Sequence, residues 1–225
     1  MGVVTCDGSE PRVTEGFLAR ARFGATAGAT GASLRFSPAD GSAPANATLV
    51  HRMSTAFVEW RPARRWSLAL GLGALAGGRL SIDWTRGAER GALLPGVLAT
   101  ATGSYLIALE GARSPFVLAG LTFGVGAERF VRDGAASSEP MTALDLRASL
   151  TLGKTFAERL RPYVAVRAFG GPAMLGERAV GSDRYHLQIG GGLAVVLPRG
   201  FDIFVDASPG PERAASFGLG FAPGR

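Results

Sequence analysis

The chain carries few residues of the kinds that perform catalysis or bind metals. It has two histidines, His51 and His186, and a single cysteine, Cys6. Their spacing to one another and to carboxylates does not match a zinc site, and no Gly-x-Ser-x-Gly sequence marks a nucleophilic serine. A single cysteine cannot form an internal disulfide. We therefore expect neither a metal nor another cofactor.

Residues 148–155 loosely match a phosphate-binding loop, because they end in a Gly-Lys-Thr triplet. Such a loop needs a flexible glycine turn that is followed by a helix. Here apolar and polar residues alternate over residues 144–152, which is typical of a strand. Pro162 would also interrupt a following helix. This context argues against nucleotide binding.

His186 is the strongest candidate for a catalytic base. Ser182 and Asp183 precede it near the end of a predicted loop. Carboxylates in other predicted loops could approach the same rim: Asp40, Asp83 and Asp133. A histidine beside a serine or a carboxylate can hydrolyse a peptide or an ester bond, so a hydrolase is retained as an alternative. A lone histidine is more often a structural polar residue, and we expect no enzymatic activity.

The elements that must position these residues are strands. Between Trp66 and Leu80, apolar residues occupy nearly every second position, and small or polar residues occupy the others. Successive side chains of a strand point to opposite sides, so one face of this segment is apolar and the other is small or polar. The same alternation recurs along the chain. No run approaches the length of uncharged apolar residues that a transmembrane helix needs.

We predict ten strands, near residues 14–36, 48–61, 65–82, 92–110, 114–132, 140–156, 161–176, 183–198, 200–208 and 214–222. Short, often charged turns alternate with longer loops rich in Gly, Ser, Asp and Pro. The short turns are 61–65, 110–113, 157–160 and 198–200, and the longer loops are 37–47, 83–91, 133–139, 177–182 and 208–213. Short turns at one rim and long loops at the other are typical of an outer-membrane barrel.

The predicted fold is an antiparallel up-and-down transmembrane β-barrel of ten strands, with eight strands as the alternative. Residues 13–225 would form this single domain, and residues 1–12 a periplasmic extension. Met1 to Arg12 has no apolar core of signal-peptide length, so we expect the sequence to represent a mature exported chain. Several predicted strands exceed the roughly 9–11 residues that cross a bilayer. The excess would project beyond the lipid on the long-loop side.

The last predicted strand ends on an aromatic residue, Phe221, although Ala222–Arg225 follow it. This strand resembles the C-terminal signal of outer-membrane barrel proteins. Together with the hairpin pattern, it makes nearly the whole chain similar to the small barrels of the OmpA-like, OmpX-like and OmpW-like superfamily. The resemblance implies a location in the bacterial outer membrane and specifies architecture more than activity.

The charged residues distribute as a barrel lumen requires. Net charge is +6 and Lys154 is the single lysine, so the cations are arginines, which favour bidentate pairs with carboxylates. They are scattered along the chain and not gathered into a stripe, which argues against nucleic-acid binding. The predicted lumen charge network is Arg20, Arg22, Glu59, Arg79, Glu110, Glu128, Asp145, Arg147, Arg167, Arg184, Asp202 and Asp206.

Aromatic residues gather near the predicted strand ends, as they do at membrane interfaces. Those near the short turns are Phe17, Trp60, Trp66, Phe156, Phe201 and Phe221. Those near the long loops are Phe36, Trp84, Phe130 and Tyr185. We predict that these two groups form aromatic girdles on the lipid-facing side.

These patterns predict a monomeric outer-membrane barrel whose apolar flank contacts lipid and whose ionic flank faces the axis. Expected partners are the bilayer, with lipopolysaccharide as a candidate, and an envelope or extracellular protein. The favoured function is a structural anchor or scaffold that presents extracellular loops. A narrow pore for small solutes or ions is the alternative, because ten strands lie near the size at which side chains fill the interior. The rim hydrolase is the second alternative.

Overall fold

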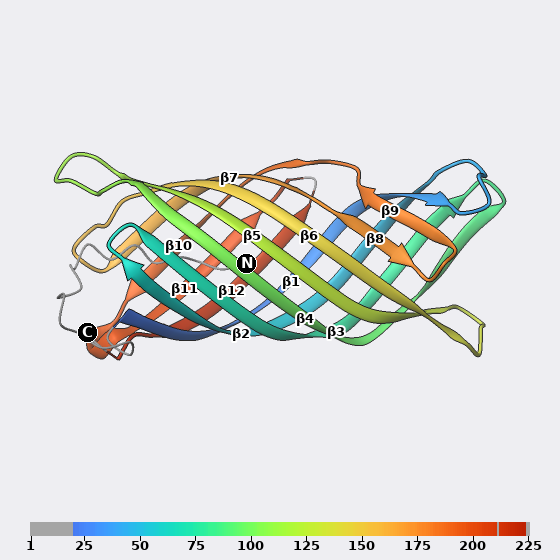
Figure 1. Ribbon diagram of the computed structural model, residues 1–225, viewed down its shortest axis with the longest axis horizontal. Coiled ribbons are helices and arrows are strands. Elements are labelled where there is room, and N and C mark those ends of the chain that lie inside the picture. The colour runs from blue at the N-terminus through green and yellow to red at the C-terminus, as the bar shows by residue number, and fades with distance from the viewer. Residues whose placement is uncertain (1–19, 211, 224–225) are drawn as a thin grey trace.

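The structure, a computed structural model, describes residues 20–210 and 212–223. The predicted extension at residues 1–12 and the girdle residue Phe17 lie outside this range. The described residues form long antiparallel strands that wrap around one axis, as Figure 1 shows. The strands are β1 (Ala21–Pro38), β2 (Ala45–Ala63), β3 (Trp66–Trp84), β4 (Gly87–Ala108), β5 (Phe116–Arg132), β6 (Ser138–Gly153), β7 (Leu160–Gly170), β8 (Pro172–Leu175), β9 (Ala179–Asp183), β10 (Leu187–Val196), β11 (Phe201–Ser208) and β12 (Arg213–Phe221).

The sheet closes through β1 and β12, which pair from Phe23–Phe221 to Gly31–Arg213. Strand β8 continues β7 beyond Gly171, and β10 continues β9 beyond residues 184–186. The twelve segments therefore make a ring of ten strands. The predicted up-and-down barrel of ten strands is confirmed, and closure leaves no open sheet edge.

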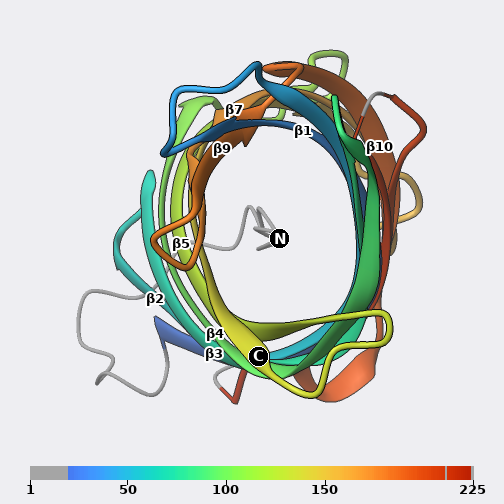
Figure 2. The same ribbon diagram turned by 90° about the vertical axis from the view of Figure 1, so that its right-hand side faces the viewer.

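The ring does not keep ten strands over its whole length. The β11–β12 hairpin stops at Ser208 and Arg213, and beyond it β9 pairs directly with β1, where Asp183 lies opposite Leu34. We call the part that contains β7 and β10 to β12 the ten-stranded section. The part that contains β8, β9 and the adjoining ends of β1 to β6 is the eight-stranded section. Figure 2 views the barrel from the eight-stranded end.

Two β-bulges lie near the boundary between the sections. Strand β3 gains one residue relative to β2 around Gly77, whose φ of +89° suits glycine. Strand β4 gains one relative to β5 between Leu94 and Val97. An extra residue reverses which face each later side chain occupies. Beyond the first bulge, Leu80 is therefore inside the barrel instead of on the predicted lipid face.

The outer wall of the ten-stranded section is apolar and exposed. Leu72 is 73% exposed, Val97 66% and Ile189 64%, on three different strands. Burying such side chains in water-free surroundings is favourable, and a continuous apolar belt on a closed barrel is what lipid requires. Here the predicted arrangement holds, with apolar residues outside and polar residues inside. Among the described residues, no helix is long and apolar enough to cross a membrane.

The eight-stranded section is built the other way round, which corrects the expectation of one orientation throughout. Apolar side chains from all eight strands meet inside it: Leu34, Phe36, Ala45, Ala47, Leu49, Leu80, Ile82, Leu93, Phe130, Met141, Ala173, Leu175 and Ala179. The Phe36 and Phe130 side chains are fully buried, at 0% exposure. We call this cluster the apolar seal. An interior of eight strands is just wide enough for side chains to fill.

Strands β2 to β4 are longer than the sequence predicts, and the loops at the eight-stranded end are shorter. Residues 83–91 were predicted as a loop, yet only Thr85 and Arg86 separate β3 from β4. Strand β4 has 22 residues, about twice the 9–11 that cross a bilayer. The excess length forms the eight-stranded section, which extends the barrel beyond the apolar belt as a rigid sheet.

Candidate functional site in the barrel lumen

The first lumen cluster lies at the short-turn end and is centred on Arg22. Its guanidinium donates to both Asp202 carboxylate oxygens, at 2.8 and 2.5 Å, and to Glu59 at 3.3 Å. All three residues are buried. The guanidinium reaches along the inner wall from β1 to β11 over Gly220 of β12, where an added Cβ would lie 2.5 Å from its Nη2 atom. The glycine is therefore needed to make room for the arginine.

A second cluster is built on β7 and β11. Arg167 donates to the Asp206 carboxylate at 2.5 Å and to the Ser208 hydroxyl at 2.6 Å. Tyr163, a neighbour on β7, donates its hydroxyl to the same Asp206 oxygen at 2.8 Å. The alternation places these side chains on the inner face. Together they connect β7 to β11 across the inner face of β10, which lies between them in the sheet.

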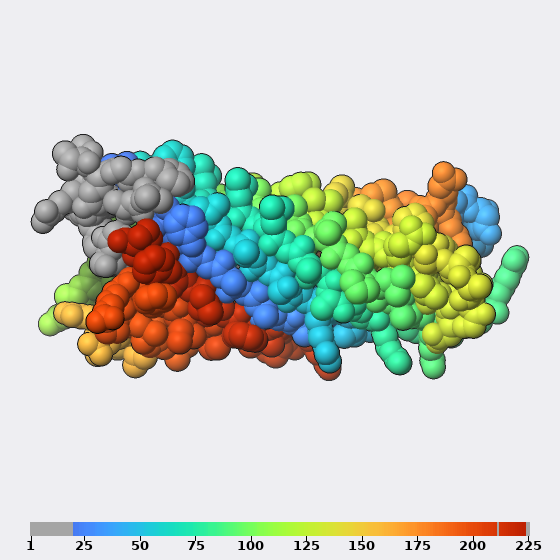
Figure 3. All heavy atoms as spheres, turned by 90° about the horizontal axis from the view of Figure 1, so that it is seen from below, coloured from blue at the N-terminus to red at the C-terminus, as the bar shows by residue number. Residues whose placement is uncertain are grey.

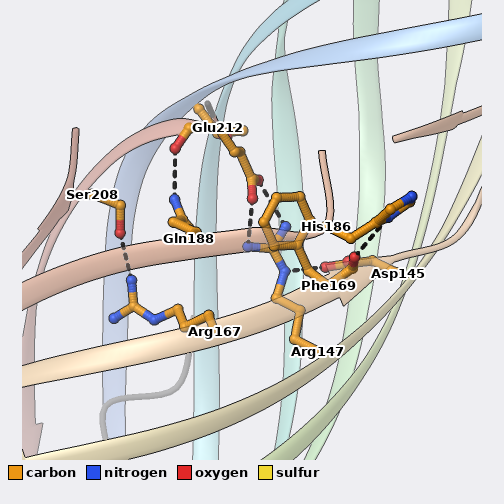
Figure 4. A network of polar contacts seen from close by, with 9 residues as sticks. Asp145, Arg147, Arg167, Phe169, His186, Gln188, Ser208 and Glu212 are labelled. Carbon is orange, nitrogen blue, oxygen red and sulfur yellow. Dashed lines mark hydrogen bonds and ion pairs between the residues drawn. The ribbon is translucent and has the colours of Figure 1, made fainter. Parts of the chain in front are cut away.

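A third cluster connects β6 to the loop that ends the β11–β12 hairpin. Arg147 donates to both Glu212 oxygens, at 3.0 and 2.8 Å, and also pairs with Asp145. The Gln188 side chain donates to the Glu212 backbone carbonyl at 2.6 Å. Figure 4 shows Glu212 turned inward above Arg147. The hairpin loop is thus fastened to the opposite side of the lumen.

A histidine and a carboxylate face each other between these clusters and the apolar seal. His51 Nδ1 lies 3.9 Å from Glu128 Oε1, and Glu128 is buried. Within the described residues, His51 Nδ1 and Glu128 Oε2 have no hydrogen-bond partner. Such a distance leaves room for a bridging water.

The rim of the eight-stranded section has its own ion network, centred on Glu89. Arg178 donates to both Glu89 oxygens, at 2.7 and 3.0 Å, and Arg132 and the Trp84 indole add bonds of 3.0 and 2.9 Å. Burial opposes ionisation of this carboxyl, yet the hydrogen bonds from Arg178 and Trp84 outweigh it and hold the pKa of Glu89 below its ordinary value. Glu139 also binds Arg178, at 3.2 Å.

Four residues of the predicted charge network do not take part in the ion clusters of the lumen. Arg79 follows the β3 bulge, so it is exposed on the outer wall. Arg184 lies between β9 and β10, where the alternation also changes, and is exposed against the Tyr185 ring. Glu110 lies in the turn after β4 and accepts two bonds from Thr155 at 2.7 Å. Arg20 precedes β1 and donates to the Pro62 carbonyl at 3.3 Å.

The remaining eight predicted residues lie on the inner face: Arg22, Glu59, Glu128, Asp145, Arg147, Arg167, Asp202 and Asp206. Sequence reasoning missed the inward groups of two loops and two strand ends, namely Glu212, Arg178, Glu89 and Gln188. The even-numbered residues of β12 face the lumen, and extending this alternation two residues back from Ala214 identifies Glu212 as an inward residue. The Arg178 side chain comes from a turn, where no alternation exists to follow.

The predicted girdle is complete only in part. Trp66, Phe156, Phe201, Phe221 and Tyr185 are exposed on the outer face, and Trp60 is half-buried. Phe36, Trp84 and Phe130 point inward instead and contact the apolar seal. Strand β1 has no bulge, so Phe36 shares the inner face with Arg22, and on β5 Phe130 shares it with Glu128. Only Tyr185 of the long-loop group faces outward.

The lumen of the ten-stranded section encloses a cavity of about 230 Å³. Threonines from β4 and β5 line its middle, the Arg147 and Arg167 clusters line one side, and Leu34, Leu49 and Met141 form its roof. The roof residues belong to the apolar seal. The cavity is therefore amphipathic and closed toward the eight-stranded end.

The candidate hydrolase residues do not form a catalytic group. The His186 ring meets the Phe169 carbonyl, with Nδ1 at 3.2 Å, as Figure 4 shows. Ser182 is exposed and Asp183 half-buried on the opposite face of β9. Among the described residues, no serine or carboxylate hydrogen-bonds to the ring. The described part of the chain also has no cluster of histidine, cysteine and carboxylate side chains suited to a metal.

Comparison with known proteins gives similarity of shape alone. No protein-family model matches the chain, and no curated protein matches it. Solved structures with a similar outline include the translocator domain of the autotransporter NalP from Neisseria meningitidis, with 14% identity, a TM-score of 0.47 and 91% of this chain and 89% of that one covered. The transport unit of the autotransporter AIDA-I from Escherichia coli has 12% identity, a TM-score of 0.46 and coverage of 90% and 89%.

The toluene transporter TodX from Pseudomonas putida is similar at 9% identity and a TM-score of 0.30, over 89% of this chain and 87% of that one. The class of this protein is therefore identified from the features of its own sequence and structure. It has a closed antiparallel ring, an exposed apolar belt around one section and ion pairs inside that section. Only a lipid environment satisfies that combination, and barrels of this kind belong to bacterial outer membranes. The chain is a bacterial outer-membrane β-barrel of ten strands.

Proposed function

We propose that this barrel is a sealed structural anchor that presents its eight-stranded section to a partner in the envelope or outside the cell. The apolar seal is the observation that carries the proposal. It contains residues from every strand of the eight-stranded section, and its two phenylalanine rings are fully buried. Ions and small solutes do not cross a packed apolar core without its rearrangement.

Two features of the eight-stranded section suit it to presentation. It is a continuation of the membrane strands and not a set of free loops, so it holds its surface in a fixed orientation. Its rim is braced by the Glu89 network, in which Arg178 joins the β8–β9 turn to β4. A rigid surface loses little conformational freedom when it binds. Among known barrels, the finer affiliation that we propose is with the small OmpA-like, OmpX-like and OmpW-like proteins.

One observation favours a narrow pore as the second candidate. The cavity below the seal is lined by hydroxyl and charged side chains, which a solute pathway would need. Conduction would then require the seal to open. The anchor and the gated pore thus differ in one property, the mobility of Phe36 and Phe130.

Conductance across planar bilayers tests the proposal. The wild-type barrel should give no stepwise openings, and a variant with Phe36→Ala and Phe130→Ala should give openings or lose stability. Leu121→Ala with Leu150→Ala is the matched control, because it removes two exposed apolar side chains from the outer wall. Regular openings of the wild-type protein would overturn the sealed anchor in favour of the pore.

The presentation role needs a separate test. The loop at residues 39–44 and the turn at residues 85–86 can be replaced by Gly-Ser sequences of equal length. A partner recovered from native membranes by cross-linking should be lost with this variant. It should be kept when the opposite turn, residues 110–113, is replaced in the same way. Equal recovery with all three proteins would contradict presentation by the eight-stranded section.

A further inference from the structure

Three exposed arginines lie on the outer wall, at the edge of the apolar belt that is nearer the eight-stranded section. They are Arg52 on β2, Arg79 on β3 and Arg213 on β12. Within the described part of the chain, none of the three guanidinium groups has a hydrogen-bond or ion-pair partner. A cation on the lipid face of a barrel is costly near the bilayer midplane and cheap near the interface. Unpaired arginines at that height are therefore suited to bind anions of the headgroup layer.

The register of the sheet places the three arginines close together. Arg213 pairs with Gly31 of β1, Gly31 pairs with Val50, and Val50 pairs with Arg79. Arg52 lies two residues from Val50 on the same face of β2. Adjacent strands are about 4.8 Å apart, so Arg213 and Arg79 are roughly 14 Å apart across the sheet. We call these three residues the arginine patch. One phosphate cannot bridge this width, but a ligand with several phosphates can.

A row of small residues leads away from Arg52 across the outer wall. Arg52 pairs with Ala29, Ala29 with Ala215, Ala215 with Ala207, and Ala207 with Gly191, so the row crosses five strands. The wall is hollowed along it, with Val205 and Phe217 also lining the groove. Because barrel strands are tilted, the groove is inclined to the membrane and leads from the patch into the apolar belt.

Figure 3 shows long side chains that stand clear of the wall over β2 to β4, toward the eight-stranded end. Carboxylates do not neutralise this face, because most of those described point into the lumen or lie in loops. Asp83, on the outer face of β3, lies four residues beyond Arg79 toward the rim. The patch thus combines unpaired guanidinium groups, which bind phosphate well, with an adjoining apolar groove.

We propose that the arginine patch and this groove bind a phosphorylated glycolipid of the outer leaflet. Arg52, Arg79 and Arg213 contact its phosphates, and Ala29, Ala207 and Ala215 contact one of its acyl chains. The eight-stranded section, which is the longer projection of the barrel, lies on the side where the outer leaflet is. The proposal does not depend on whether the lumen conducts or whether a protein partner exists.

Binding is measured with the full chain in detergent micelles, titrated with purified lipopolysaccharide and with the same lipopolysaccharide after phosphatase treatment. The patch variant carries Arg52→Gln, Arg79→Gln and Arg213→Gln. The matched control carries Arg65→Gln, Arg113→Gln and Arg159→Gln, three exposed arginines at the short-turn end. A cation near an anionic lipid surface contributes about 1 kcal/mol. We therefore expect the affinity for lipopolysaccharide to fall about fivefold for each arginine replaced in the patch variant, and to change little in the control.

A second pair of variants tests the groove. Ala29→Leu with Ala215→Leu should fill it and weaken binding of the whole glycolipid. The same variant should leave unchanged the binding of the de-acylated, still phosphorylated headgroup. Ala101→Leu with Ala148→Leu is the control, because these exposed alanines lie on the wall formed by β4 and β6.

Three results would overturn the proposal. The patch variant could bind lipopolysaccharide as tightly as the wild type. Both arginine variants could lose affinity equally, which would indicate general charge attraction. Vesicles of phosphatidylglycerol could compete as well as lipopolysaccharide at equal phosphate, which would indicate any anionic lipid. Thermal unfolding of each variant, which should match that of the wild type, separates lost binding from lost folding.

Discussion

Replacement of Arg22 by methionine is the most direct test of the lumen ion pairs. The Arg22 and Asp202 side chains are 3% and 2% exposed, and Arg22 supplies two bonds to Asp202. It also lies against the Phe57 and Phe204 rings, 5.1 and 5.6 Å from their centroids. Glu59 keeps Arg61 as a partner at 3.1 Å in the variant. Asp202 would be left buried with a charge and no cation.

The loss of one partner of a buried pair costs about 3–5 kcal/mol, which is roughly a 150- to 5000-fold shift toward the unfolded state. The assay is urea-induced unfolding of the refolded barrel, followed by its altered migration on gels and by tryptophan fluorescence. Arg132→Met is the control, since Arg132 is 52% exposed in its pair with Glu89 and an exposed pair contributes about 0–1 kcal/mol. Arg22→Met with Asp202→Leu should recover most of the loss, because an apolar pair of similar volume is tolerated.

Two outcomes would refute this reasoning. A cost below about 1 kcal/mol for Arg22→Met would mean that the lumen solvates Asp202 as well as bulk water does. Failure of the double variant to recover stability would mean that Arg22 acts through its contacts with the rings and not through its charge.

Further predictions concern the seal, the rim and the histidine. Phe130→Ala should cost about 3–5 kcal/mol in the same unfolding assay, whereas Phe123→Ala, on the outer wall of the same strand, should cost much less in lipid; equal costs would contradict a packed seal. Because the pKa of Glu89 is below its ordinary value of 4.5, its contribution is complete above that pH and is lost as the pH falls through the folded-state pKa. The protection of amides at the β8–β9 turn against exchange, relative to an unfolded chain at the same pH, should accordingly fall at low pH, and Glu89→Gln should remove this change in protection; protection that does not change with pH in the wild type would argue against the network. His186→Ala should leave any peptide or ester hydrolysis by the purified barrel unchanged. A loss of turnover in this variant would instead support the hydrolase hypothesis.

The sequence predicted the number and order of the strands because alternation is a local property. Each strand shows its own period of two, as in Trp66 to Ala76, and needs no knowledge of its neighbours. The lipid-facing wall of the ten-stranded section followed for the same reason. Arg22, Arg147 and Arg167 are assigned to the inner face correctly, although their partners Asp202, Glu212 and Asp206 come from parts of the sheet that are not their direct neighbours, and these pairings depend on closure and shear, which no single strand encodes.

The errors begin where the alternation is interrupted. The Gly77 bulge is one residue long, and its Gly77-Gly78 pair does not stand out in a chain with 33 glycines, so the sequence places Arg79 and Leu80 on the wrong faces. Phe36 and Phe130 are a different kind of error. Their alternation with Arg22 and Glu128 already pointed inward, but aromatic residues near strand ends were assigned to a girdle by composition. A side chain's face is decided by register, and composition is a weaker guide to it.

The change from ten strands to eight explains why the two sections have opposite interiors. Ten strands leave a lumen too wide for one layer of side chains, and long arginines with carboxylates span it around a cavity of about 230 Å³. At the boundary the β11–β12 hairpin ends, β3 and β4 bulge, and β9 moves beside β1. The narrower ring that results can be filled by Phe36 against Gly181 and Phe130 against Gly91, where an added Cβ would lie 2.8 and 2.6 Å from the rings. Outside the bilayer the outer wall no longer needs to be apolar, so the apolar side chains of this section are free to turn inward and close the lumen.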